Sequence, residues 1–487
     1  MGGGLLNIVS HGASSIFVFG NPQKSMFYKT YKSITNFGMQ RFRLECDKKM
    51  SLNVADETKF SFKVERHADM LGDTHLVVNL PDIWFYNDGN DVIKMKWVDE
   101  LGATMIEEIV IESGGTILSK YSGEYISLVE HRDNANKLAL WYDMIGCTDE
   151  LTKINKAVVP GGKYPNIRGR KLYIPLNCWF TRGVDQALPL VSLQYSFVYI
   201  HIRIRPLKQL YHVNVGNENN WVAPKLENSN HRFSKFLNFT NENTDNDFDW
   251  DVHLLSTYYF LDDKERNVIA KKENKYLMKD VYQYTYHNLH GNSAFNLESR
   301  GLVIGYQFRC RRSDVYKRNE WTNYTNFQYK SDEYSNIALS TPEQNYYIYE
   351  EIIKNFRLII DGNDRENTLD VGVMKYIEPY TRSKSIGKKG VYHYNFTVNT
   401  DLNEYQPYGA MNMDKFEEIN IHIQTIEPPI NTENKTTVCN INPITGFEEI
   451  VQTSQDIFKY TFDLEVFEER YNIVVIKNGI IGTLFAR

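Results

Sequence analysis

The residues best suited to binding a metal are His287 and His290, which are spaced as an HxxH motif. A zinc site completes such a pair with cysteine or carboxylate ligands at a characteristic spacing, and no such set accompanies these two residues. We therefore interpret both as surface histidines. The sequence predicts no metal and no cofactor.

A run of aspartates places carboxylates at every second position, as calcium loops do: Asp245, Asp247, Asp249 and Asp251. A calcium hand also needs Gly at its sixth position and Glu at its twelfth, where this run has Trp250 and Ser256. We expect a solvent-facing acidic loop at 241–251 instead.

The segment Asp361-Gly362-Asn363-Asp364 also begins like a calcium loop, but its twelfth position is Gly372. It directly follows the strand-like residues 356–360. An Asp-Gly pair after a strand is typical of a tight hairpin turn, which is the structure that we predict here.

Signatures of catalysis and nucleotide binding are missing from the sequence. It contains no GxxxxGK[ST], HExxH, GxSxG or GxGxxG pattern, the motifs of phosphate binding, metal-dependent hydrolysis, acyl transfer and dinucleotide binding. We predict that the chain is not an enzyme. Lys384, Lys388 and Lys389 form a small basic loop, which we interpret as solvated.

Covalent modification is the remaining chemistry. Four Asn-x-Ser/Thr sequons could carry a glycan if the chain meets a glycosylation machinery: Asn238, Asn323, Asn395 and Asn434. Five scattered cysteines include no CxxC pair: Cys46, Cys147, Cys178, Cys310 and Cys439. An odd count without a paired spacing predicts free thiols in a reducing compartment.

Charge and hydropathy limit the class of partner. The net charge is −6 and the pI is about 6.1, which argues against wholesale coating of nucleic acid, because that needs a basic face. The sequence has neither an apolar run of about 18 residues nor a signal-peptide pattern at its start. Leu6 stands where a myristoylation signal has Ser or Thr, so we do not expect lipidation.

The elements that would position any site are predominantly strands. Aromatic residues make up 14% of the 487 residues, a bias that favours β-structure. The clearest strand lies within 197–206, where an apolar residue occupies every second position: Val198, Ile200, Ile202 and Ile204. Such alternation buries one face and leaves the other polar.

A second strand repeats this one later in the chain. Ile200-His201-Ile202 and Ile421-His422-Ile423 share the same pattern. The separation of their histidines along the chain is a domain's length. It suggests that one β-domain is built twice in tandem; chance similarity of two amphipathic strands is the alternative.

We divide the chain accordingly. Residues 1–27 are a Gly-rich terminal arm, 28–206 a first β-domain, 207–251 a polar connector or surface loop, and 252–487 a second β-domain. One helix is predicted to begin at Asp262, which caps an acidic first turn, with Val268, Ile269, Leu277 and Val281 as its apolar positions.

Short motifs across the chain resemble the major capsid proteins of nucleocytoplasmic large DNA viruses. The first half carries Gly3-Gly4-Leu5-Leu6, Gly20-Asn21-Pro22-Gln23, Thr35-Asn36-Phe37, Ser122-Gly123-Glu124-Tyr125 and 172–180, where Cys178 replaces the family's usual aromatic. The second half carries 258–266, 358–365, Tyr405-Gln406-Pro407 and 471–482 in the family's order.

The resemblance implies an all-β fold of two tandem eight-stranded antiparallel jelly rolls, with a few short helices in loops. It implies a homotrimeric capsomer of pseudo-hexagonal outline that tiles the icosahedral shell. The implied partners are neighbouring capsomers, minor capsid and penton proteins and, through the N-terminal side, an internal viral membrane, with no direct nucleic-acid binding. The implied location is the virion, assembled in the host cytoplasm.

Two other functions fit a chain of this kind. One is a minor capsid or spike protein of the same fold, which copy number per virion would distinguish. The other is a lectin or carbohydrate-active jelly-roll protein, in which aromatic residues would stack on sugars; a cleft with paired carboxylates would identify it.

Overall fold

The computed structural model describes residues 3–4, 12–48, 51–89, 91–152, 164–215, 221–237, 250–326, 351–385, 387–401, 405–431, 435–441, 448–454 and 457–485. The chain forms two compact units, residues 1–37 and 38–487. The smaller unit contains helix α2 (Ala13–Phe19), and among its described residues the large apolar side chains are exposed, for example those of Phe17 and Phe27.

The first half of the larger unit is built from eight principal strands: β1 (Phe37–Leu44), β2 (Thr58–Lys63), β3 (Met70–Asn79), β6 (Ile106–Ser113), β7 (Thr116–Tyr121), β8 (Lys171–Pro175), β10 (Val198–Ile204) and β12 (His253–Leu261). They form two sheets, ordered β1-β12-β3-β8 and β2-β10-β6-β7. Their recorded pairings are antiparallel.

The second half repeats the arrangement with β13 (Asn274–Leu289), β14 (Asn292–Asn296), β15 (Leu302–Arg312), β16 (Ile353–Ile360), β17 (Asn363–Asp370), β18 (Val391–Asn395), β20 (Ile419–Thr425) and β25 (Phe462–Lys477). Its sheets are ordered β13-β25-β15-β18 and β14-β20-β16-β17. Counted within each half, both orders are first-eighth-third-sixth and second-seventh-fourth-fifth. The chain is therefore a double jelly roll, as predicted.

The repeated Ile-His-Ile strands are equivalent elements of this fold. They are β10 and β20, the seventh strand of each half, and both alternate buried and half-buried residues along their length. Each lies inside its four-stranded sheet, between the second and fourth strands of its half. The prediction of a tandem β-domain is confirmed by this shared position.

Strand β12 changes the division of the chain. The sequence-based boundary assigned residues from 252 onward to the second domain, but β12 pairs with β3, for example through Leu254 with Leu76. Without this eighth strand the sheet of the first half would lack the strand between β1 and β3. Residues 253–261 therefore belong to the first jelly roll, because sheet pairing and not sequence proximity defines the domain.

Shorter strands extend or decorate the two jelly rolls: β4 (Tyr86–Asp88), β5 (Asp91–Trp97), β9 (Leu188–Pro189), β11 (Tyr211–Val215), β19 (Met411–Asn412), β21 (Ile430–Asn431), β22 (Lys435–Ile441), β23 (Glu448–Ser454), β24 (Ile457–Phe458) and β26 (Ile480–Thr483). The Asp361-Gly362 pair joins β16 to β17 with both residues at positive φ, 48° and 75°. This is the predicted hairpin turn.

The helices are α3 (Leu101–Met105), α4 (Gly123–Asp133), α5 (Leu138–Ile145), α6 (Asp149–Thr152), α7 (Asp263–Lys271) and α8 (Glu378–Arg382), which continues a π-helical turn, η9 (Val373–Ile377). The predicted helix at Asp262 is α7, but it ends at Lys271. Leu277 and Val281 instead lie on β13, where the long ladder with β25 overrides their helical spacing. No helix of the described residues is long and apolar enough to cross a membrane.

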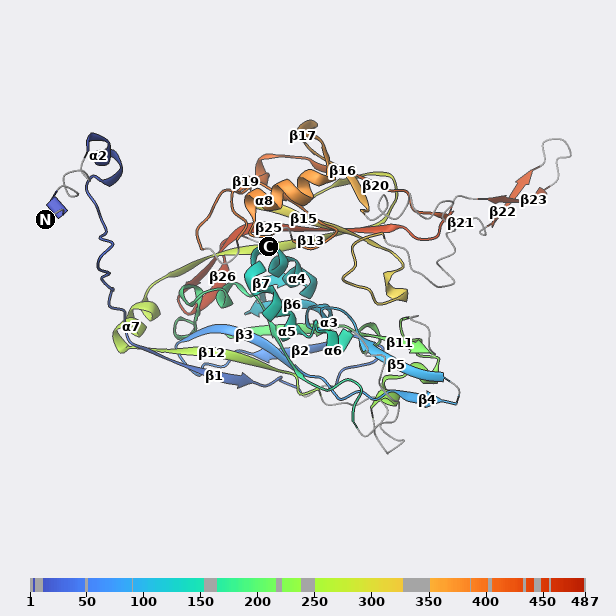
Figure 1. Cartoon of the computed structure of the whole chain (residues 1–487), viewed down its shortest axis with the longest axis horizontal. Coiled ribbons are helices and arrows are strands. Elements are labelled where there is room, and N and C mark those ends of the chain that lie inside the picture. The colour runs from blue at the N-terminus through green and yellow to red at the C-terminus, as the bar shows by residue number, and fades with distance from the viewer. Residues whose placement is uncertain are drawn as a thin grey trace. The chain divides into compact units, whose positions relative to one another are not determined.

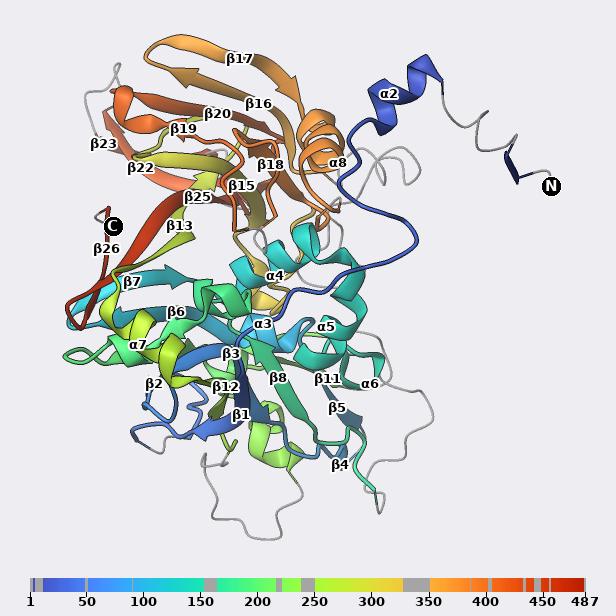
Figure 2. The ribbon, with the colours of Figure 1, turned by 90° about the vertical axis from the view of Figure 1, so that its left-hand side faces the viewer.

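The described residues of the larger unit form two large apolar cores and a small cluster around Met70, Ala187 and Tyr259. One lies in the first jelly roll and extends onto Val281, Phe467 and Val474, which are on strands of the second jelly roll. The other lies between the two sheets of the second jelly roll, around Phe308 and Phe356. Figure 1 shows the two jelly rolls with α4 between them, and Figure 2 shows the same junction from the side.

Candidate functional site: the junction between the two jelly rolls

Helix α4 is the central element of the junction. Ser122 caps its start, because its hydroxyl accepts a hydrogen bond from the Tyr125 backbone N–H at 3.3 Å. Glu124 in the first turn and Arg132 in the last complement the helix dipole. All residues of the helix are buried, although several of them carry charge. A β-carbon on Gly123 would collide with the carbonyl oxygen of Ala103.

Glu124 binds three arginines at the start of α4. Its carboxylate accepts hydrogen bonds from Arg205 at 3.1 Å, Arg311 at 3.0 Å and Arg309. Arg309 also pairs with Glu465 at 2.7 Å. Burial alone would raise the pKa of Glu124, but the three guanidinium groups outweigh it and hold that pKa well below its usual range.

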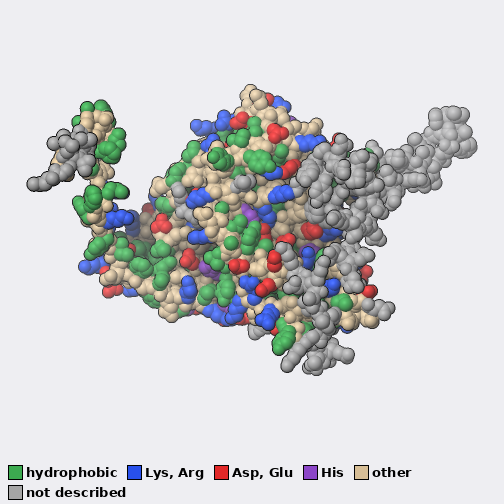
Figure 3. Space-filling model, viewed as in Figure 1, with side chains coloured by type: hydrophobic (Ala, Val, Ile, Leu, Met, Phe, Trp, Pro, Cys, Tyr) green, Lys and Arg blue, Asp and Glu red, His purple; other side chains and the backbone are tan. Residues whose placement is uncertain are grey.

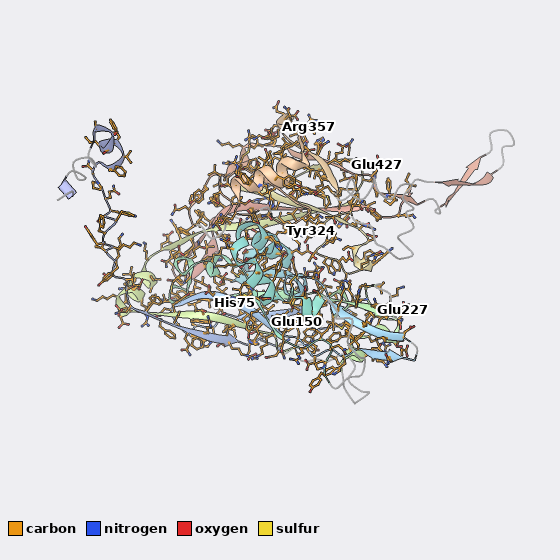
Figure 4. All side chains as sticks on the ribbon, in the orientation of Figure 1. His75, Glu150, Glu227, Tyr324, Arg357 and Glu427 are labelled. Carbon is orange, nitrogen blue, oxygen red and sulfur yellow. The ribbon has the colours of Figure 1, made fainter. Side chains whose placement is uncertain are left out.

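Aromatic rings cover these guanidinium groups. Arg309 lies 4.6 Å from the ring centre of Tyr324, while Arg205 and Arg311 lie 4.7 and 5.3 Å from that of Trp321. Such cation–π contacts stabilise desolvated cations. Tyr324 is seen between the two jelly rolls in Figure 4.

Arg132 forms a second set of contacts at the end of α4. Its guanidinium donates to both oxygens of Asp133, at 2.9 and 2.8 Å, and to both oxygens of Glu469 on β25, at 3.1 Å each. Tyr125 donates to the same Glu469 carboxylate at 2.8 Å. Burial would raise the pKa of Glu469, but Arg132 lowers it below the usual value.

Glu100 links the other side of α4 to the second jelly roll. It pairs with Lys388 at 2.7 Å and accepts a hydrogen bond from the Ser127 hydroxyl at 2.5 Å. His131 lies beside it, 2.7 Å from the Tyr142 hydroxyl. Burial lowers the pKa of His131 more than Glu100 raises it, so the imidazole is neutral near pH 7.

We call this set the junction network. Its members are Glu100, Glu124, Arg132, Asp133, Arg205, Arg309, Arg311, Lys388, Glu465 and Glu469. The acids are paired with cations inside the protein and are largely closed to solvent. This arrangement suits the joining of two domains, because separating them would leave buried charges without partners.

Of the residues singled out in the sequence, only Glu124 of the Ser122–Tyr125 motif and Lys388 of the basic loop belong to this network. The Lys388 side chain is 12% exposed and pairs with Glu100, so it is not solvated as predicted. His287 is exposed and pairs with Asp463 at 3.1 Å, and His290 packs on Phe458. Among the described residues no group of three or more His, Cys, Asp or Glu could hold a metal ion.

Most of the predicted acidic loop, 241–249, lies outside the described residues. Asp251 at its end pairs with Arg43 at 2.5 Å, and both side chains are exposed to a similar degree. Solvent exposure of the loop as a whole therefore stays a prediction.

Two of the four sequons, at Asn238 and Asn434, lie outside the described residues. Asn323 and Asn395 are half-buried, and their side-chain amides donate to Glu320 at 3.4 Å and to Glu378 at 3.1 Å. A glycan on either residue would replace one of the two hydrogens on its side-chain nitrogen. Glycosylation at both positions stays a prediction. The described cysteines, 46, 147, 178 and 310, are free.

Sequence reasoning missed the junction network. Helix α4 ends with Glu130, His131, Arg132 and Asp133 in succession, so its sequence reads as a solvated surface segment. The detectable signal was the Ser122 cap followed by Glu124. The packing of the two jelly rolls decides which charges from distant parts of the chain contact Glu124, as Arg309 does.

The charged surface contrasts with this interior. On the face in Figure 3, Lys and Arg side chains are interspersed with Asp and Glu over the larger unit. The described charges of this face therefore form no extended patch of one sign.

Two family models together match nearly the whole chain. The model described as the major capsid protein N-terminus matches residues 25–262, and the model described as the large eukaryotic DNA virus major capsid protein matches residues 265–482. The first ends at the close of β12, which agrees with the strand pairing.

Curated relatives carry related descriptions. The chain is 21% identical over 505 residues to the major capsid protein of Paramecium bursaria Chlorella virus 1, with 100% of both chains covered. It is 27% identical over 301 residues to capsid protein 1 of Acanthamoeba polyphaga mimivirus, covering 60% of this chain and 45% of that protein. The match to the major capsid protein of Phaeocystis pouchetii virus, at 24% identity, covers 64% and 57%. These last two alignments span about half of each relative.

Solved structures share the fold. The PBCV-1 virus capsid superposes with a TM-score of 0.64 at 16% identity, covering 95% of this chain and 100% of that one. The Faustovirus major capsid protein gives 0.64 at 11% identity, covering 98% and 99%. At these identities the likeness concerns the fold.

Proposed function

The chain belongs to the family of major capsid proteins of large eukaryotic DNA viruses, and from this we propose that it forms homotrimeric capsomers that tile an icosahedral shell. The observation that carries the proposal is the repetition of one strand order in both halves of the chain. Three such chains supply six similar blocks, and a ring of six blocks has the pseudo-hexagonal outline that fills a flat facet.

The junction network supports the same proposal. A capsomer must keep its outline when it contacts its neighbours, so the two jelly rolls of each chain must not move independently. Buried ion pairs between Glu124 and Arg309 and between Arg132 and Glu469 join the blocks across their interface. We infer that this network makes one chain a rigid third of the capsomer.

The partners of such a tile follow from its place in a shell. We propose contacts with neighbouring capsomers and with minor capsid and penton proteins, and an N-terminal side that faces an internal membrane. Assembly would take place in the host cytoplasm before the chain enters the virion. The mixed surface charge in Figure 3 is compatible with protein neighbours.

The mass of the purified chain tests the proposal. Size-exclusion chromatography with light scattering should give three times the 57.0 kDa of one chain. Electron microscopy of that fraction should show particles of hexagonal outline. A mass of 57.0 kDa at every concentration would contradict the trimer.

A further inference from the structure

The repeated strands β10 and β20 place a histidine at the same point on the outer face of their sheets. His201 lies opposite Ser61 of the neighbouring strand β2, and His422 lies opposite Ala294 of the equivalent strand β14. Both histidines are half-buried, and the isoleucines on either side of them point into the cores. The outer faces of the two sheets can therefore be compared position by position.

The outer face in the first jelly roll is charged, and its polar groups bind one another. Arg203 pairs with Glu108 at 3.3 Å. The imidazole of His201 is 2.9 Å from the hydroxyl of Ser61 and 3.5 Å from the carboxylate of Glu112. Its side chains thus form contacts within the face itself.

The outer face in the second jelly roll carries amides at the equivalent positions. Lys59, Lys63, Tyr199, Arg203 and Glu108 of the first jelly roll correspond to Asn292, Asn296, Asn420, Gln424 and Asn355 of the second. An amide supplies hydrogen-bond donors and an acceptor without a charge. The second face is therefore polar but largely neutral.

A hollow of about 410 Å³ opens over this neutral face. The side chains that line it include Asn292, Ala294, Asn355, Arg357, His422 and Gln424. Figure 4 shows Arg357 on the side of the second jelly roll that faces away from the first. Sites for small molecules commonly have volumes of about 300–1,000 Å³, so the hollow is large enough for a sugar residue.

Polar groups in this hollow remain available to a ligand. The Asn355 amide nitrogen donates to the Gln424 side-chain oxygen at 2.6 Å, which orients both amides. The Asn355 oxygen and the Gln424 nitrogen then have no partner among the described residues, and neither has the imidazole of His422. The hollow thus presents both donors and acceptors from adjacent strands.

We propose that this hollow binds a neutral carbohydrate. Each hydroxyl of a sugar donates and accepts hydrogen bonds, which matches the mixed donors and acceptors of amide and imidazole groups. The guanidinium of Arg357 already donates to both oxygens of Asp364, at 2.8 and 2.7 Å. With its one guanidinium paired in this way, the lining favours an uncharged sugar over a sialylated or sulfated one. This binding activity goes beyond the proposed capsomer and does not depend on it.

A glycan array tests the inference. The chain is produced in bacteria, so that it carries no glycan of its own, and is applied to immobilised neutral, sialylated and sulfated oligosaccharides. We expect binding to neutral oligosaccharides that the same sugar inhibits when free in solution. Binding to none of the neutral oligosaccharides, or to charged ones alone, would overturn the inference.

Two variants locate the site. Gln424→Arg combined with Asn355→Glu installs the charged pair of the first jelly roll, and Ala294→Phe fills the hollow. Each should weaken binding of the selected oligosaccharide by about 10-fold or more, because hydrogen bonds to it are lost, while circular dichroism shows an unchanged fold. Arg203→Gln combined with Glu108→Asn is the matched control on the first jelly roll and should bind like the wild type.

The outcomes distinguish the hollow from other surfaces. Wild-type affinity in both variants would place the sugar elsewhere and overturn the inference. Variants that lose lattice association but keep their affinity for the sugar would also overturn it, because the face would then contact a neighbouring capsomer. The mass of the purified chain, which tests the trimer, is measured separately from all of these results.

Discussion

Arg309 shows what single residues contribute to the junction. Its side chain is fully buried and serves two carboxylates, Glu124 and Glu465. Removing it would take the closest cation from both carboxylates. Glu124 would keep Arg205 and Arg311, but Glu465 would keep only the longer contact with Arg311, at 3.5 Å. A buried charge without a partner costs far more than the pair contributes when it is intact.

We therefore predict that Arg309→Met lowers the free energy of unfolding by about 3–5 kcal/mol. Urea denaturation of variant and wild type at equal protein concentration measures the difference. Arg357→Met is the matched control, because Arg357 makes a similar two-pronged contact with Asp364 on the surface. The control should change little; an equal loss in both variants would contradict the role of burial.

The buried histidines predict a dependence on pH. Burial lowers the pKa of both His212 and His393 to about 3, whereas an unfolded histidine titrates near 6.5, roughly its free-solution value. Between these values the unfolded chain binds protons that the native chain does not. Stability from these groups is therefore complete above about pH 6.5 and is lost as the pH falls toward 3.

Replacing one histidine should reduce this dependence. Between pH 6 and 4.5, the unfolding free energy of His393→Gln should fall less steeply than that of the wild type, by up to about 1.4 kcal/mol per pH unit. Urea titrations at fixed ionic strength measure the slopes. His287→Gln, at an exposed position, is the control, and identical slopes in all three proteins would refute the prediction.

At the scale of elements, α4 depends on a glycine at its start. A side chain at Gly123 would meet the backbone oxygens of Ala103 and Ile106, which cannot move without shifting α3 or β6.

Gly123→Ala should therefore destabilise the chain by about 1–3 kcal/mol, the usual cost of overpacking. Thermal unfolding followed by circular dichroism provides the comparison. Gly482→Ala serves as the control, because nothing lies within 4 Å of its added β-carbon. Equal melting temperatures for Gly123→Ala and wild type would show that α4 tolerates a wider separation.

Element prediction from the sequence succeeded where the pattern is local. Strands such as β10 and β20 alternate strictly, and a period of two requires only neighbouring residues. The end of α7 was wrong because the spacing of Leu277 and Val281 also fits a helical period. They form a strand because they pair with β25, which lies near the other end of the second jelly roll's sequence.

For the whole molecule, the two compact units predict separable roles. Residues 38–487 hold both jelly rolls and the junction network, while the smaller unit exposes apolar side chains, with Phe17 at 92% and Phe27 at 97%. Exposed apolar segments of this kind mark a binding surface for a partner. We expect the partner to be encountered on assembly.

Deleting residues 1–27 should accordingly leave the trimer intact but prevent its association into extended lattices. Light scattering measures the first property and electron microscopy of assembled material the second. A deletion variant that still forms lattices would refute a role for the arm in assembly.

The sequence by itself determined the class of fold, the tandem repeat and the family, because these follow from alternation along a strand and from short motifs in a fixed order. It also argued correctly for a hairpin at Asp361-Gly362, whose backbone demands are local. Only the tertiary structure decided that β12 completes the first jelly roll, that α4 is buried, and that Glu124 meets Arg309 from the other half of the chain. Those features depend on which surfaces from distant parts of the chain pack together. The free energy of such packing cannot be inferred from any one segment of the sequence.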